Sequence, residues 1–151
     1  MATTNFVYPT YKNNLLLGAA NVSLNGTVGT APWVTLLENT YTYSAAHTVY
    51  ADISAHLSGA TDTAMVSAGV GPAVSLPNGT FDADDVTFSA VAAGTEIANL
   101  IIYRATTGTG TGQLVLVERG DDDTAPVTGL PVVPNGGDIS ISFSASGILL
   151  I

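Results

Sequence analysis

The stretch NLIIYRATTGTGTGQLVLVER, residues 99 to 119, is the strongest fold signal in this chain. Two apolar runs, residues 99–105 and 113–119, flank a segment made only of threonine and glycine. Runs of this length and composition are typical of buried strands, and a glycine-containing connection of this kind joins antiparallel neighbours. We therefore predict a β-hairpin. The sequence GTGTG (108–112) then lies at the hairpin tip and is not a phosphate-binding loop, because no helix follows it.

The C-terminal stretch DISISFSASGILLI, residues 138 to 151, alternates apolar residues with serines. This alternation predicts a strand with one face in a core and one hydroxylated face. The last four residues, Ile148, Leu149, Leu150 and Ile151, are all apolar. We expect them to be buried or covered by a neighbouring chain.

Turn signals recur along the rest of the chain. Asn-Gly pairs begin at Asn25, Asn78 and Asn135, and this pair readily accepts the positive φ of a tight turn. Short strands with turn signals between them are typical of a β-sandwich or barrel. We predict a mostly antiparallel all-β domain over residues 13–151, with further strands at 31–39, 64–70, 73–77 and 86–92.

One segment has the spacing of a helix. In SAAHTVYADISAHL, residues 44–57, Ser44 is a candidate N-cap, and Val49 and Ile53 are four residues apart. We therefore predict a single short helix near residues 47–54.

The first twelve residues show no such period. They carry Phe6, Tyr8 and Tyr11, and we expect an extended N-terminal arm over residues 1–12. An arm this short cannot bury three rings by itself, since each ring has about 150–250 Å² of surface to cover. These rings and the apolar C-terminal residues are therefore the candidate contacts with a partner.

The charge of the chain excludes two classes of partner. Twelve acidic residues stand against Lys12, Arg104 and Arg119, which gives a net charge of −9. Binding to nucleic acid needs clustered basic residues that neutralise phosphates, and anionic membranes need the same. The longest apolar runs are far shorter than the ~20 residues of a membrane helix. The N-terminus also lacks the pattern of a secretory signal, so we expect synthesis in the cytoplasm and attach no weight to the sequons at Asn21, Asn25 and Asn78.

Two acidic stretches are candidate cation sites. In FDADDVTFSA (81–90), three aspartates precede an alternating apolar run, but the glycine and the distant glutamate of a calcium-binding EF-hand loop are missing. We interpret this stretch as a turn that leads into a strand. The stretch GDDDT (120–124) is expected to be a solvated loop. A bound cation is the alternative at either place.

Catalytic motifs are scarce in this sequence. The two histidines, His47 and His56, are nine residues apart with Asp52 between them, whereas metal-binding pairs on a helix are spaced at i, i+4. The chain has no cysteine and no G-x-S-x-G nucleophile motif. We expect structural roles for the histidines, no metal, no cofactor and no enzymatic activity.

Several stretches together resemble a group of small structural proteins of tailed bacteriophages. In chain order they are NFVYPTYKNNLLLGAANVSLNGTV (5–28), YTYSAAHTVYADISAHLSG (41–59), FDADDVTFSA (81–90), LIIYRATTG (100–108) and ISFSASGILLI (141–151). They span most of the chain. The segment GTAPWVTLLEN (29–39) departs from the pattern, because Pro32 and Trp33 stand where a plainer strand is expected.

The resemblance implies a virion component, most directly a capsid decoration or cement protein. Such a protein binds the outer surface of the major capsid protein lattice and is often a homotrimer. Low charge and few long flexible side chains suit a surface that is ordered against a partner. Two other functions remain open. One is a tail, baseplate or fibre-associated protein, and the other is a carbohydrate-binding β-sandwich that uses Trp33 and tyrosines as its platform.

Overall fold

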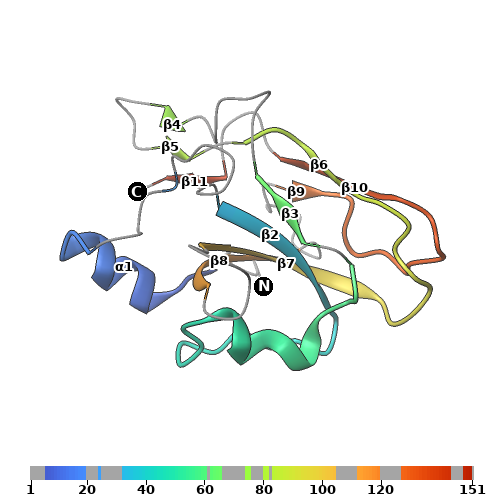
Figure 1. Ribbon diagram of the computed structural model, residues 1–151, viewed down its shortest axis with the longest axis horizontal. Helices are drawn as coiled ribbons and strands as arrows, with labels where there is room; N and C mark the ends of the chain where they lie inside the picture. The colour runs from blue at the N-terminus through green and yellow to red at the C-terminus, as the bar shows by residue number, and fades with distance from the viewer. Residues whose placement is uncertain are drawn as a thin grey trace, which may run out of the picture.

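A five-stranded antiparallel sheet forms the centre of the molecule (Figure 1). The computed structural model describes residues 6–19, 24, 32–60, 62–65, 74–75, 80–81, 83–104, 112–119, 127–143 and 148–150. In spatial order the strands of this main sheet are β1 (Phe6–Val7), β8 (Gln113–Arg119), β7 (Ile97–Arg104), β2 (Pro32–Glu38) and β3 (Thr63–Ala64). The predicted hairpin is confirmed as β7 and β8. Its tip, residues 106–111, lies outside the described residues.

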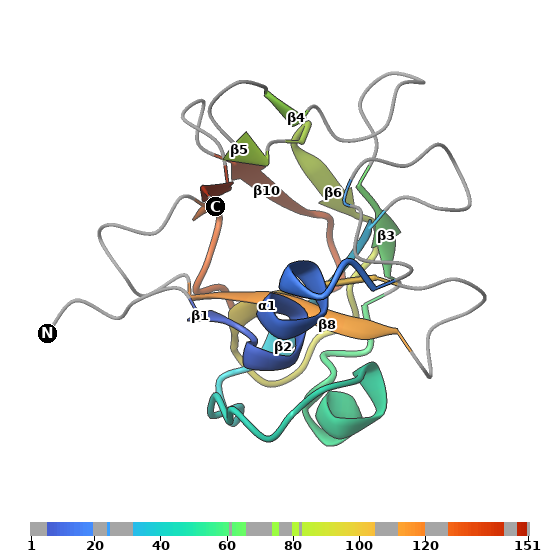
Figure 2. The same ribbon diagram turned by 90° about the vertical axis from the view of Figure 1, so that its left-hand side faces the viewer.

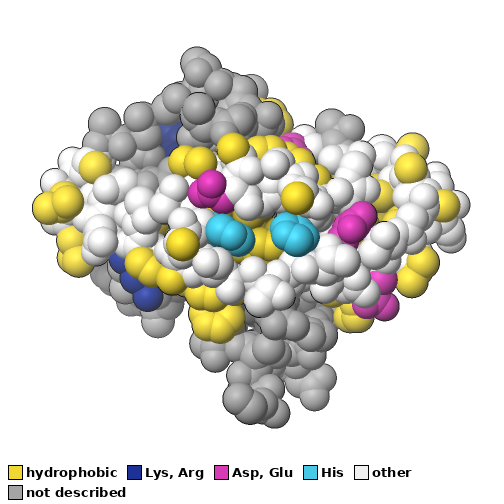
Figure 3. All heavy atoms as spheres, turned by 90° about the horizontal axis from the view of Figure 1, so that it is seen from below, with side chains coloured by type: hydrophobic (Ala, Val, Ile, Leu, Met, Phe, Trp, Pro, Cys, Tyr) yellow, Lys and Arg dark blue, Asp and Glu magenta, His cyan; other side chains and the backbone are white. Residues whose placement is uncertain are grey.

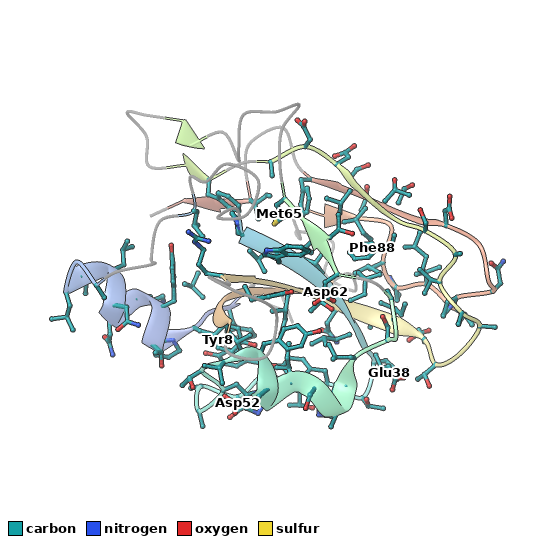
Figure 4. The ribbon with its side chains drawn as sticks, in the orientation of Figure 1. Tyr8, Glu38, Asp52, Asp62, Met65 and Phe88 are labelled. Carbon is teal, nitrogen blue, oxygen red and sulfur yellow. The ribbon has the colours of Figure 1, made fainter. Side chains whose placement is uncertain are left out.

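The two faces of the main sheet are covered by different kinds of structure (Figures 1 and 2). On one side lie two three-stranded sheets. One is formed by β6 (Val86–Phe88), β10 (Ile139–Phe143) and β9 (Val127–Thr128), and the other by β11 (Leu149–Leu150), β5 (Thr80–Phe81) and β4 (Val74–Ser75). On the other side lies the 3₁₀ helix η1 (Tyr50–His56). Figure 4 shows Met65 and Phe88 on the first side of β2, and Tyr8 and Asp52 on the second.

Strand β10 shows how alternation in the sequence becomes a two-faced strand. Ile139 and Ile141 are buried, whereas Ser140 between them is exposed. Ser140 stands opposite Thr87 of β6, and the two hydroxyl oxygens are 3.2 Å apart. The predicted hydroxylated face is therefore present on β10.

The long strands β8 and β2 are each bordered on their outer side by short segments of the same chain. Along β8, β1 pairs with Leu116 and Val117, and residues 48–50 bond to Gly112 and Leu114. Along β2, the Met65 and Ser58 amides donate to the Pro32 and Leu36 carbonyls, respectively. Covered edges leave few free backbone groups for another strand to pair with.

Three predictions about local elements need correction. A single short helix was expected near residues 47–54 with Ser44 as its N-cap. The observed helix η1 begins at Tyr50, because the Asp52 carboxylate accepts hydrogen bonds from the Thr48 and Val49 amides (2.7 and 3.0 Å). Ser44 instead accepts a bond from the Ala46 amide in the preceding turn. The strand predicted at 86–92 is shorter in the structure, as β6, and the one predicted at 64–70 is described only as far as Met65, with β3 ending at Ala64. Of the strand predicted at 73–77, only Val74 and Ser75 are described, and they form β4.

The largest correction concerns the N-terminal arm, which is not extended over residues 9–16. A second helix, α1 (Pro9–Leu16), begins with proline at its first position, where no backbone N–H is needed. It ends at Gly18, whose φ of +62° suits a residue without a Cβ. The Gly18 and Ala19 amides donate to the Leu15 and Asn14 carbonyls, which is the Schellman arrangement.

The chain thus forms a β-rich structure with two helices and, among its described residues, no closed barrel. Of the predicted Asn-Gly turns, the one at Asn135 is confirmed, since Gly136 has a φ of +93° and donates to the Val91 carbonyl. The turns at Asn25 and Asn78 lie outside the described residues.

Two glycines of positive φ allow a matched test of this fold. Gly129 has a φ of +106°, and a Cβ there would collide with the Ser140 carbonyl of β10. Gly136 has a similar φ of +93° but open space around it. We expect Gly129→Ala to lower the free energy of unfolding by about 2–4 kcal/mol and Gly136→Ala by about 1 kcal/mol. Urea denaturation measures both, and equal losses would contradict the close approach of Gly129 to β10.

Candidate functional site

Figure 3 shows the two histidines of the chain near each other on one face of the molecule. In the structure both imidazoles contact the ring of Tyr41. Tyr41 is at the centre of this group. Its hydroxyl lies 2.6 Å from the Tyr8 hydroxyl and 3.2 Å from Nδ1 of His47. Its ring lies between the two imidazoles, with centroids 5.8 Å from His47 and 5.5 Å from His56. We call Tyr8, Tyr41, His47 and His56 the tyrosine–histidine cluster.

The hydrogen bonds of Tyr41 allow a direction of donation to be assigned within this cluster. A phenol has one proton to donate and two lone pairs to accept with. We assign the Tyr8 hydroxyl as the donor to Tyr41, since the bond between them raises the pKa of Tyr8 and lowers that of Tyr41. The Tyr41 proton is then directed to Nδ1 of His47. Neutral His47 therefore carries its proton on Nε2.

Burial suppresses ionisation of these phenols. It raises the pKa of Tyr8 far above its ordinary value, and the hydrogen bond to Tyr41 acts in the same direction. Burial also raises the pKa of Tyr41, although the bond from Tyr8 partly offsets it. Neither phenol forms a phenolate near neutral pH, so neither can act there as a nucleophile or base.

The histidines and Asp52 do not form a catalytic triad. Asp52 is exposed, and its carboxylate bonds to the Thr48 and Val49 amides, which lower its pKa. Nδ1 of His56 lies 3.1 Å from the Thr40 hydroxyl, and Nδ1 of His47 bonds to Tyr41. One nitrogen of each imidazole is therefore engaged within the chain. This geometry favours the structural role that the sequence predicted.

A second cluster was not predicted from the sequence. The Tyr103 hydroxyl of β7 donates to Oδ2 of Asp62 at 2.6 Å. The rings of Tyr50 and Tyr103 are 4.7 Å apart. Burial, together with Asp62, raises the pKa of Tyr50 to about 12 and also raises that of Tyr103. The contact between the two rings thus joins η1 to the main sheet.

The two acidic stretches provide fewer candidate cation ligands in the described residues than their composition indicates. Asp84 and Asp85 are exposed, and Oδ1 of Asp85 accepts a bond from the Phe143 amide at 2.9 Å. Asp85 therefore connects the start of β6 to the end of β10, which supports a structural role for this connection. Asp82 and residues 120–124 lie outside the described residues. Within the described part of the chain, no three histidine, aspartate or glutamate side chains are grouped so that they could hold a metal ion.

The predicted N-terminal contact residues already contact their own chain. Phe6 is half-buried and stacks on Tyr43, with centroids 4.3 Å apart and planes 12° apart. Tyr8 and Tyr11 are 0% and 1% exposed. As expected, the short segment does not bury these rings by itself; the domain that follows supplies the cover for Tyr8 and Tyr11.

The predicted C-terminal contact residues are likewise part of the fold. Ile148 is buried, and its amide donates to the Phe81 carbonyl. Leu149 and Leu150 form β11, whereas Ile151 lies outside the described residues. The expectation of burial or cover at this end is therefore met for Ile148 by the chain itself.

The most exposed large apolar side chains of the described residues were missed by the sequence interpretation. Leu16 and Leu17, at the end of α1, are 86% and 81% exposed. The sequence contains an indication of this patch in the run NNLLLG, where three leucines directly precede the glycine that ends the helix. These residues are better candidates for partner contact than the buried rings are.

The geometry gives no support to an aromatic carbohydrate platform. Tyr8, Tyr11, Tyr41, Tyr50 and Tyr103 are all buried, and Trp33 is partly buried against the core. Carbohydrate-binding platforms need exposed ring faces, and this chain directs most of its rings inward.

Comparisons with known proteins add no relative. No protein family, characterised protein or solved structure was found to be similar to this chain. None of the helices in its described part is long and apolar enough to cross a membrane. The resemblance to bacteriophage structural proteins therefore stays a hypothesis.

The hydrogen-bond direction in the tyrosine–histidine cluster predicts a single histidine tautomer. In its neutral form, His47 should carry its proton on Nε2. Long-range ¹H–¹⁵N correlation spectra distinguish the two tautomers. In the variant Tyr41→Phe, His47 should become a mixture of the two tautomers, whereas the signals of His56 should not change. A pure Nδ1–H form in the wild-type protein would contradict the assignment.

The buried phenols predict a loss of stability at high pH. An unfolded tyrosine ionises near pH 10, whereas burial raises the pKa of Tyr11 and Tyr50 to about 12. Their contribution is complete below pH 10 and is lost as the pH rises towards 12, because only the unfolded chain releases these protons.

The matched variant for this test is Tyr11→Phe. Between about pH 10 and 11.5, the free energy of unfolding of this variant should fall by about 1–2 kcal/mol less than that of the wild-type protein, since the variant has one titrating phenol fewer. Urea unfolding at a series of pH values measures the difference. A wild-type free energy of unfolding that stays constant to pH 11.5 would contradict the neutral burial of these rings.

Proposed function

We propose that this protein is a structural component of a bacteriophage virion, most specifically a capsid decoration or cement protein. In this role it binds the outer surface of the major capsid protein lattice as a homotrimer and stabilises the head. The observation that carries the proposal is the exposed leucine pair at the end of a well-capped helix, on a chain of low charge. It adds to the resemblance in the sequence.

The leucine pair supports a role in binding rather than in chemistry. Burying a leucine side chain stabilises a contact by about 1.5–3 kcal/mol. The Schellman bonds at Gly18 and Ala19 hold the pair in one position before any partner arrives, so little conformational entropy is lost on binding. By contrast, the histidines, Asp52, Asp62 and Asp85 are all engaged in bonds within the chain.

The charge supports a position on the outside of the particle. A chain with a net charge of −9 is repelled by packaged DNA, because both carry negative charge. In this proposal the two small sheets and the main sheet pack as the layers of a β-sandwich, with α1 projecting from one end. That arrangement leaves the hydroxylated face of β6 and β10 directed outward.

Counting copies per particle tests the proposal. Virions of the phage that encodes this chain should contain hundreds of copies of it. Particles that lack the protein should release their DNA at a lower temperature, or after a smaller change in ionic strength, than complete particles do. Quantitative mass spectrometry of purified virions gives the number relative to the major capsid protein. A handful of copies would instead assign the protein to the tail or baseplate, and no copies would refute a virion role.

A further inference from the structure

Three side chains of the tyrosine–histidine cluster form a series of hydrogen bonds that runs from the core to the surface. The Tyr8 hydroxyl lies 2.6 Å from that of Tyr41, which in turn lies 3.2 Å from Nδ1 of His47. Tyr8 is 0% exposed and Tyr41 is 5% exposed. The His47 imidazole is half-buried, and Figure 3 shows both imidazoles at the surface. Protons from the solvent can therefore reach one end of the series, while the other end is closed.

The protons of this series have acceptors in one direction of donation only. Within the described part of the chain, Tyr41 is the one hydrogen-bond partner of the Tyr8 hydroxyl. When Tyr8 donates to Tyr41 and Tyr41 donates to His47, each hydroxyl proton has an acceptor. If Tyr41 donated to Tyr8 instead, the Tyr8 proton would be buried without an acceptor, which destabilises a fold. The complete series therefore needs a free lone pair on Nδ1 of His47.

A second proton on His47 removes that lone pair. Both nitrogens of an imidazolium are donors, so Nδ1 can no longer accept a bond from Tyr41. The Tyr41 proton then has no acceptor, unless it turns to Tyr8 and leaves the Tyr8 proton without one. In either case one buried hydroxyl is unsatisfied. A charge gained at the surface thus acts on a phenol in the core.

The buried phenol at the inner end belongs to the N-terminal segment, residues 6–17. Tyr8 stands between β1 and α1, and its ring centroid lies 5.4 Å from that of Tyr43. On one side of it, β1 pairs with β8 through only two residues. On the other side, Tyr11 is the one buried residue of α1. The contacts on both sides are few, so docking of the segment depends strongly on Tyr8.

We propose that His47 is a proton-sensitive switch for the docking of the N-terminal segment. With a neutral imidazole the series of hydrogen bonds is complete, and the segment is held on the body. When His47 gains a proton, the Tyr8 hydroxyl finds a new partner by moving to solvent, and the segment moves with it. Loss of one buried hydrogen bond of this kind weakens the docking roughly 5- to 150-fold.

Three further titratable groups act on this part of the molecule. The exposed Asp52 carboxylate interacts electrostatically with His47, while its Oδ2 accepts two backbone amide bonds at 2.7 and 3.0 Å. His56 contacts the same Tyr41 ring, and its Nδ1 is engaged with a threonine hydroxyl. Tyr43 interacts electrostatically with both phenols of the series. Asp52 therefore favours proton uptake by His47, whereas a charge on His56 opposes it.

Amide hydrogen exchange in α1 measures the docking of the segment. Eight residues are too few to keep a helix once it is detached, so a released segment loses its helical hydrogen bonds. The Lys12 and Leu17 amides carry such bonds near the two ends of α1. Their exchange is expressed as a protection factor, which removes the intrinsic effect of pH on the exchange rate. The ring ¹⁵N signals of His47 report its charge in the same samples.

In the wild-type protein, the protection of these two amides should fall roughly 5- to 150-fold as the His47 ring becomes doubly protonated. The variant His47→Asn places a side-chain oxygen near the position of Nδ1 and has no imidazole to titrate. Its protection factors should therefore stay constant over the same series of samples. The matched control His56→Asn removes the other histidine of the cluster and should show the wild-type fall.

The variants separate this switch from a general effect of acid. Protection that does not change when wild-type His47 is doubly protonated would overturn the proposal, and so would an equal fall in His47→Asn. A fall that disappears only in His56→Asn would also overturn it. Should His47→Asn fail to fold, Tyr41→Phe decides, because its α1 amides should be less protected from the start and show no further fall. A further fall of wild-type size there would contradict the switch. None of these measurements needs a partner, so the switch and the virion role can fail separately.

Discussion

The complete burial of β7 is the constraint on which the rest of the structure depends. All eight residues of this strand are buried, and it lies between β8 and β2 in the middle of the sheet. A strand with two buried faces needs cover on both sides. The small sheets cover one face, and η1 with the residues before it covers the other. The helices in the described part of the chain are too short to cover a whole face of the sheet. The cover on the second face is therefore built largely from aromatic rings.

Tyrosines suit that cover because each ring has an apolar body and a polar end. Tyr50 and Tyr103 bury their rings against each other, and the Tyr103 hydroxyl donates to Asp62. Tyr8 and Tyr41 are also buried, with His47 as the acceptor. Every one of these hydroxyls would destabilise the fold if it were buried without a partner, by about 1–3 kcal/mol. The half-buried Asp62 carboxylate and His47 imidazole are therefore part of the packing, because they accept hydrogen bonds from the buried tyrosine hydroxyls.

The sequence predicted the elements whose signals are local. The hairpin 99–119 follows from two continuous apolar runs around a glycine-containing connection, and the strand 139–143 from a period of two. Both signals are determined by neighbouring residues alone. Local signals for α1 were also present, with Pro9 at its start and Gly18 after its end, but the aromatic residues obscured them. The clusters could not be predicted, because Tyr8 and Tyr41 are 33 residues apart and Tyr103 and Asp62 are 41 apart. No periodicity connects such positions, and only the folded chain brings them together.

The covered edges of the main sheet have a consequence for the protein in a crowded solution. A long free edge is a template on which further chains add as strands, and growth of that kind ends in fibrils. Here β8 and β2 are bordered by pieces of only two or three residues, each of which turns away at once. Such pieces cannot propagate a sheet beyond themselves. Addition of a further long strand along β8 or β2 is therefore opposed by the fold itself, although few charged side chains are present to keep copies of the chain apart.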